Sequence, residues 1–157
     1  MPEKEEYPEL FYRGISSKGF LDSSGHPNIS TFVFDDVGRN DLFREMSVNW
    51  NDSSESLDVL LGQKKENGCI QFVGGAISFE LSKIREILYP LIVDKKFHYE
   101  RRPLENNKFH GNLLLKYDPN DKAESKQSDS LVRNFLVLMG KHQSVIPNYN
   151  VESDQSD

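Results

Sequence analysis

Apolar residues in this chain occur in short runs, and residues that favour turns lie between them. Some runs alternate apolar and polar residues or are rich in β-branched and aromatic side chains, which is typical of half-buried strands. These runs are 10–15, 28–34, 43–50, 69–79 and 110–117. Segments with apolar residues at helical spacing are 52–62, 81–88 and 130–142. Because the strands do not alternate regularly with long helices, we expect an α+β domain: a mixed sheet of about five short strands with about three helices.

Other segments are predicted to lack regular structure. Residues 94–108 are charged and are predicted to be irregular. The short segment 91–93 before them could instead extend a strand. The polar segment 117–129 has no large aliphatic side chain and is predicted to be a mobile loop. The two ends bury too little apolar surface to order themselves, unless residues such as Val145 and Ile146 dock on the body. We therefore expect one folded domain over 7–142 and flexible tails over 1–6 and 143–157.

Charge and composition exclude several classes of protein. The net charge is −6 over 157 residues, whereas a dedicated nucleic-acid binder needs a basic face. No run approaches the roughly 20 apolar residues that span a bilayer, and the acidic start lacks the apolar core of a signal peptide. The expected location is therefore the cytoplasm. The sequence makes no prediction about the oligomeric state.

Metal and cofactor motifs are missing from the sequence. Cys69 is the only cysteine, which excludes a disulfide framework and a cysteine-based zinc cluster. No two histidines have the spacing of metal ligands. The phosphate-binding loop of nucleoside triphosphatases, the histidine pair of zinc proteases and the serine elbow of hydrolases are also absent. We therefore expect neither a metal nor a cofactor.

Arg13 is the first candidate, in the sequence Phe11-Tyr12-Arg13-Gly14. The planar guanidinium binds a carboxylate or phosphate through two parallel hydrogen bonds, and a neighbouring glycine lets a ligand approach the backbone. We predict that Arg13 binds substrate together with Tyr12 and Thr31. The structural alternative is an arginine that stacks on its aromatic neighbours and pairs with a surface acid.

Ser30, Ser47 and His110 are the catalytic candidates. Both serines lie within predicted strands, and a serine acts as a nucleophile when a base is adjacent. His110 opens a predicted strand beside Gly111, where an imidazole is both held and reachable, and histidine changes charge near neutral pH. The alternatives are a cross-strand hydrogen bond for each serine and hydrogen bonds to loop carbonyls for His110.

These positions give the chain a resemblance to a group of small bacterial proteins of uncharacterised function. The resemblance spans about 10–116, and its motifs here are Tyr12-Arg13, 27–32, 46–48, 76–88 and 107–110. Lys108 stands where that group usually has proline, and the resemblance implies no known activity. Tyr12-Arg13-Gly14 followed by Ser30-Thr31 is also similar to ADP-ribosyltransferases. That activity would require a late glutamate, for which only Glu100 and Glu105 are in position.

Two functions are compatible with these residues. The acidic charge, the polar loops and the lack of a strong catalytic motif favour a protein-binding or accessory module. The alternative is an enzyme acting on a nucleotide, NAD or another phosphate-bearing substrate, by ADP-ribosyl transfer, phosphate transfer or hydrolysis. The enzyme hypothesis predicts that Arg13, Ser30, Ser47 and His110 converge on one pocket of some hundreds of cubic ångströms.

Overall fold

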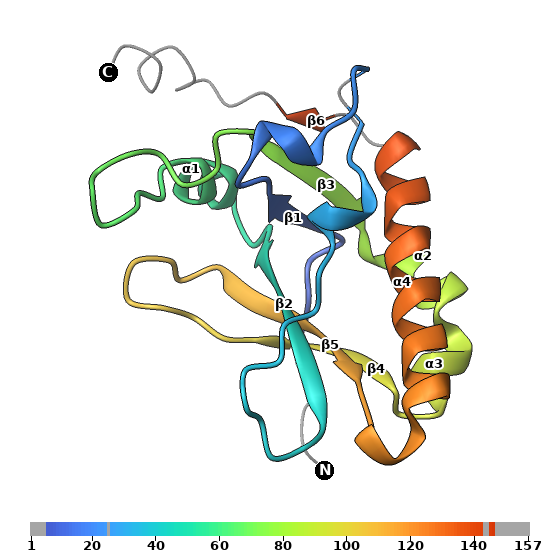
Figure 1. The fold of residues 1–157 in the computed structure, drawn as a ribbon. Coiled ribbons are helices and arrows are strands. Elements are labelled where there is room, and N and C mark those ends of the chain that lie inside the picture. Colours follow the sequence, from blue (N-terminus) through green and yellow to red (C-terminus); the bar gives the residue numbers. More distant parts are fainter. Residues whose placement is uncertain (1–5, 25, 143–144, 147–157) are drawn as a thin grey trace.

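A single antiparallel sheet forms the centre of the molecule. The structure is a computed structural model that describes residues 6–24, 26–142 and 145–146. Its strands follow the order β4-β5-β2-β1-β3-β6 across the sheet (Figure 1). They are β1 (Leu10–Gly14), β2 (Phe43–Trp50), β3 (Ala76–Glu80), β4 (Phe97–Arg101), β5 (His110–Lys116) and β6 (Val145–Ile146). The helices are α1 (Glu55–Leu61), α2 (Leu81–Ile87), α3 (Tyr89–Val93) and α4 (Lys122–His142).

The predicted α+β single domain is confirmed. Every described pair of strands is antiparallel, whereas we expected a mixed sheet. Strand β2 covers the predicted 43–50, and β1, β5 and α1 differ from prediction by one to three residues at their ends. Among the described helices, none is both long enough and apolar enough to cross a bilayer.

Helices cover the two sides of the sheet unequally. Helix α4 lies beside α2 and α3 on one side, while α1 lies on the other (Figure 1). The larger apolar cluster includes Val132 and Leu136 of α4 packed with sheet residues such as Phe79. A smaller cluster packs Leu60 and Leu61 of α1. The stripe of apolar residues on each helix is what buries it against the sheet.

Strands β1 and β2 separate soon after they pair. Their register includes only Phe11 with Trp50 and Tyr12 with Asn49, whereas β1 pairs with β3 at five positions. From Arg13 onward β1 therefore follows β3 and leaves β2. The opening between the two strands exposes backbone carbonyl groups of β2 to side chains of β1.

The predicted strand over 28–34 is wrong. Residues Ile29–Thr31 form a short 3₁₀ helix. The side chain of Asn28 accepts a hydrogen bond from the Ser30 amide at 2.9 Å, and the Thr31 hydroxyl donates to the carbonyl of Phe20 at 3.0 Å. Such local bonds to the backbone compete with strand pairing. The alternation that suggested a strand comes from Phe32 and Phe34, which are both buried.

Four other local predictions are also wrong. Residues 91–93 belong to helix α3, and the segment predicted to be irregular contains strand β4. The predicted strand over 69–79 is regular only from Ala76. The predicted loop over 117–129 is mostly the first part of α4, because Ser125 and Ser128 are buried against the body despite their polarity. Within the predicted C-terminal tail, Val145 and Ile146 pair with β3; 143–144, 147–157 and 1–5 lie outside the described residues.

Candidate functional site

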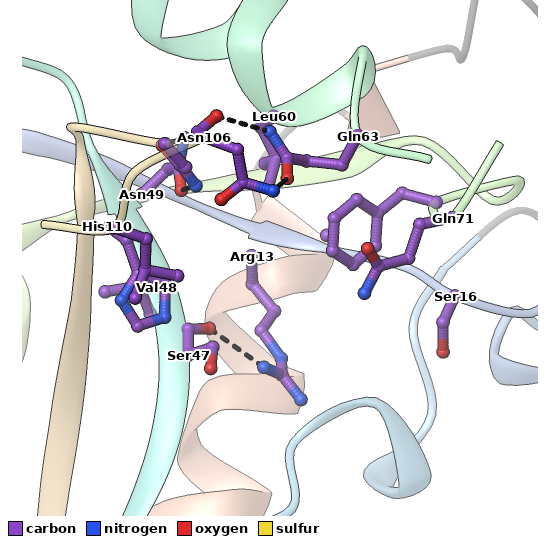
Figure 2. A pocket seen from close by; sticks show the side chains of 14 residues that line it. Arg13, Ser16, Ser47, Val48, Asn49, Leu60, Gln63, Gln71, Asn106 and His110 are labelled. Carbon is purple, nitrogen blue, oxygen red and sulfur yellow. Dashed lines mark hydrogen bonds between the residues drawn. The ribbon is translucent and has the colours of Figure 1, made fainter. Parts of the chain in front are cut away.

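A pocket of about 400 Å³ lies where β1 and β2 separate. Its walls come from both strands, from the start of β5, from the loop before β5, from the end of α1 and from the loop before β3. Figure 2 shows Arg13 near the centre of this wall, with Ser47 and His110 on one side and Gln71 on the other. The pocket therefore collects residues from distant parts of the sequence.

Three of the predicted site residues line this pocket: Arg13, Ser47 and His110. The other three do not. Ser30 is exposed at the 3₁₀ helix rather than within a strand, which moves its hydroxyl away from the pocket wall.

Tyr12 and Thr31 also lie outside the pocket wall. Tyr12 is buried in the cluster beneath α1, where it packs with Leu60 and Leu61. The Thr31 side chain is buried, and its contribution to the site is a backbone carbonyl that accepts from Arg13.

Two backbone carbonyls hold the Arg13 guanidinium. Its Nε–H donates to the carbonyl of Thr31 at 3.1 Å, and Nη1 donates to the carbonyl of Ser47 at 2.8 Å (Figure 2). A guanidinium has five N–H donors, so three have no partner among the described residues. Within that same set, no carboxylate lies within 4.0 Å of it. Neither structural alternative for Arg13, stacking or a surface ion pair, is therefore present.

Burial lowers the pKa of Arg13 to about 10, and the more distant carboxylate of Asp35 partly opposes this effect. A pKa of about 10 still leaves the side chain cationic at neutral pH. A half-buried cation without a paired carboxylate is unfavourable, because the carbonyl dipoles replace its lost hydration only in part. An anion bound in the pocket would supply the missing counter-charge.

His110 is fixed in one tautomer by its hydrogen bond. Its Nδ1 lies 2.8 Å from the carbonyl oxygen of Arg102. A carbonyl only accepts, so Nδ1 carries the hydrogen and the neutral ring presents the lone pair of Nε2. The loop-carbonyl bond that we considered as the structural alternative is therefore present. It also orients the ring, as partners of functional histidines commonly do.

Ser47 shares a face of the sheet with His110. Ser47 is paired with Asn112 in the β2–β5 register, and His110 is paired with Asn49. The two residues are therefore diagonal neighbours, about 7–8 Å apart, a separation that an aromatic ring such as imidazole can span. Ser47 is exposed, and its hydroxyl has no hydrogen-bond partner among the described residues. The cross-strand bond that we considered as its alternative is absent from that part of the chain.

Pairs of carboxamides form much of the remaining wall, and sequence reasoning missed them. Asn49 and Asn107 exchange two hydrogen bonds of 3.2 and 2.7 Å in the interior. Near the rim, the Gln63 amide donates to the carbonyl of Asn106 at 3.2 Å, and the Asn106 amide donates back to Gln63 Oε1 at 3.2 Å (Figure 2). The only sequence signal was the Asn106-Asn107 pair shortly before His110.

No group of His, Cys, Asp and Glu residues suited to a metal ion occurs in the described part of the chain. Cys69 is a free thiol, partly buried. The donors that the pocket offers are instead a guanidinium, a hydroxyl, an imidazole and carboxamides. These groups suit an anion and a neutral polar group better than a hard or soft cation.

Comparison of the chain with models of protein families, with curated proteins and with solved structures gives no match. The resemblances drawn from the motifs therefore stay predictions. A proposal about function has to rest on the geometry of the pocket.

Proposed function

We propose that this protein binds a small phosphate-bearing molecule in the Arg13 pocket. The observation that carries the proposal is the charge of the pocket wall. Arg13 is the only formally charged side chain among the described residues that line it, and no Asp or Glu is present. The chain has 25 acidic residues, so their exclusion from this wall leaves a local cation in a protein of negative net charge. Arginine matches phosphate through its planar fork of donors.

The neighbours of Arg13 support the same proposal. The Ser47 hydroxyl and, when protonated, His110 Nε2 are further donors for phosphate oxygens. A volume of about 400 Å³ lies within the range of small-molecule pockets. The protein-binding or accessory module that the sequence favoured stays a prediction, motivated by the net charge, the polar loops and the missing motifs.

A ligand that binds the folded state raises the melting temperature. With ribose 5-phosphate at a hundred times its dissociation constant, we expect about 2.7 kcal/mol of stabilisation, or roughly 5–10 °C for a domain of this size. Ribose at the same concentration is the neutral control, and sodium chloride matches the ionic strength. The proposal fails if ribose 5-phosphate, pyrophosphate and inorganic phosphate at 10 mM all shift the melting temperature no more than ribose does.

Catalysis on the same molecule is the second candidate function. It is favoured by the fixed tautomer of His110 and by the unpaired hydroxyl of Ser47 on the same face. In hydrolysis, His110 Nε2 takes the proton of a water whose oxygen bonds to phosphorus. The P–O bond to the ester group breaks, and the leaving oxygen takes that proton from His110 and departs as the alcohol. Glu100 and Glu105 do not line the pocket, so we favour hydrolysis or phosphate transfer over ADP-ribosyl transfer.

Phosphorus NMR distinguishes binding from catalysis. We expect wild-type protein incubated with a mixture of phosphate monoesters to produce a new signal that His110→Gln does not produce. The thermal shift by ribose 5-phosphate should survive in His110→Gln, because Arg13 is unchanged. If wild-type protein binds these esters and yields no new signal, the pocket is a binding site only.

A further inference from the structure

We propose that the occupant of the pocket is a nucleoside monophosphate, with its phosphate on Arg13 and an adenine base against Phe72, Gln71 and Asn106. This inference rests on the proposed function, and it names the part of the ligand that lies away from the phosphate. The observation behind it is that the pocket wall beyond Arg13 is uncharged, aromatic and rich in carboxamides.

Phe72 supplies a flat apolar surface beside Arg13. A Cβ built on Gly14 would lie 2.4 Å from the Phe72 ring, so the ring packs directly on the backbone of the residue that follows Arg13. Phe72 is partly buried and lines the pocket. The side of an aromatic ring that faces a pocket can stack a nucleobase, whichever base is present.

Gln71 and Asn106 supply hydrogen-bonding groups that the fold leaves available. The Gln71 side chain has no hydrogen bond to any described residue, although its backbone amide donates to the carbonyl of Gln63 at 3.0 Å. Asn106 uses one N–H toward Gln63, and its Oδ1 has no partner in the described part of the chain. Each side chain therefore offers both a donor and an acceptor at the pocket.

This pairing of donor and acceptor matches adenine. A carboxamide of Asn or Gln contacts adenine through N6 and N7 together, whereas the corresponding edge of guanine presents two acceptors and suits arginine or lysine. The single cation of this wall is occupied by the phosphate in our proposal. The pocket volume, near the lower end of the range of roughly 300–1,000 Å³ for ligand pockets, leaves room for one nucleotide rather than a dinucleotide.

Isothermal titration calorimetry on the full chain tests this inference, with AMP, GMP and ribose 5-phosphate as probes. In wild-type protein we expect AMP to bind about tenfold more tightly than GMP or ribose 5-phosphate. Gln71→Leu should weaken AMP about tenfold and leave ribose 5-phosphate within twofold of wild type. Gln127→Leu is the matched control, because Gln127 is exposed on α4, and it should change neither affinity.

Several outcomes would overturn the inference. Equal affinities for AMP and ribose 5-phosphate in wild-type protein would mean that no base is recognised. An unchanged AMP affinity in Gln71→Leu would mean that Gln71 does not contact the base. Equal affinities for AMP and GMP would mean that the pocket does not prefer adenine. In each case ribose 5-phosphate still binds and the proposed function stands. If none of the three compounds binds, the proposed function fails and this inference fails with it.

Discussion

Arg13→Lys is expected to weaken binding of ribose 5-phosphate by about 100-fold. The guanidinium uses two donors to hold its own position on the Thr31 and Ser47 carbonyls and keeps three for a ligand. A lysine ammonium has three donors in total on a flexible stem, so at most one remains for the phosphate once the two carbonyls are served. Hydrogen bonds to charged groups contribute about 1.5–3 kcal/mol each, and two lost bonds correspond to a factor of about 100 or more.

Arg85 offers the matched control for this substitution. It is an exposed arginine on α2 and does not line the pocket, so Arg85→Lys should bind ribose 5-phosphate as wild-type protein does. The melting temperature without ligand shows whether Arg13→Lys still folds, and Arg13→Gln provides a second, neutral variant. Titration calorimetry measures each affinity. Affinities within threefold of wild type for both Arg13 variants would exclude Arg13 as the phosphate ligand.

Part of this site could be predicted because it depends on local pattern. The alternation within 43–50 places Met46 and Val48 on one face of β2 and Ser47 on the other. The apolar run 113–115 defines the strand that His110 opens. Arg13 is unusual at the end of an apolar strand. These patterns involve only residues close to each side chain in the sequence, so the local structure that they predict is also present in the folded protein.

The separation of β1 and β2 could not be predicted, although it creates the pocket. Nothing near Arg13 indicates that β1 pairs with β2 at two positions and with β3 at five. The paired carboxamides were missed for a related reason. Gln63 and Asn106 are 43 residues apart and lie in segments without periodicity, so only the tertiary fold brings them together. Ser30 shows the converse error, because a local cap by Asn28 replaces the strand that alternation suggested.

Gly111→Ala is expected to destabilise the protein by about 4 kcal/mol. Trp50 occupies the space that a side chain would need, which costs up to about 3 kcal/mol, and relieving the clash breaks a hydrogen bond that contributes about 1 kcal/mol. A Cβ at Gly111 would lie 2.0 Å from Trp50 Nε1 and 2.4 Å from the Glu100 carbonyl oxygen. That carbonyl accepts a hydrogen bond from Trp50 Nε1 at 3.1 Å, and the indole is fully buried. Neither neighbour can move without breaking this bond or the pairing of β4 with β5.

Thermal and urea unfolding measure this effect, and we expect the melting temperature to fall by roughly 8–16 °C. Trp50 is the only tryptophan, so its fluorescence reports directly on the same contact and should shift to the red as the indole meets water. Gly19→Ala is the control, since Gly19 is exposed and a Cβ there would come no closer than 3.4 Å to its neighbours. If Gly111→Ala unfolds within 1 kcal/mol of wild type, which is the lower end of the cost of overpacking a core, then β5 does not pack beneath Trp50. Because His110 precedes Gly111 on β5, the pocket would then need a different geometry as well.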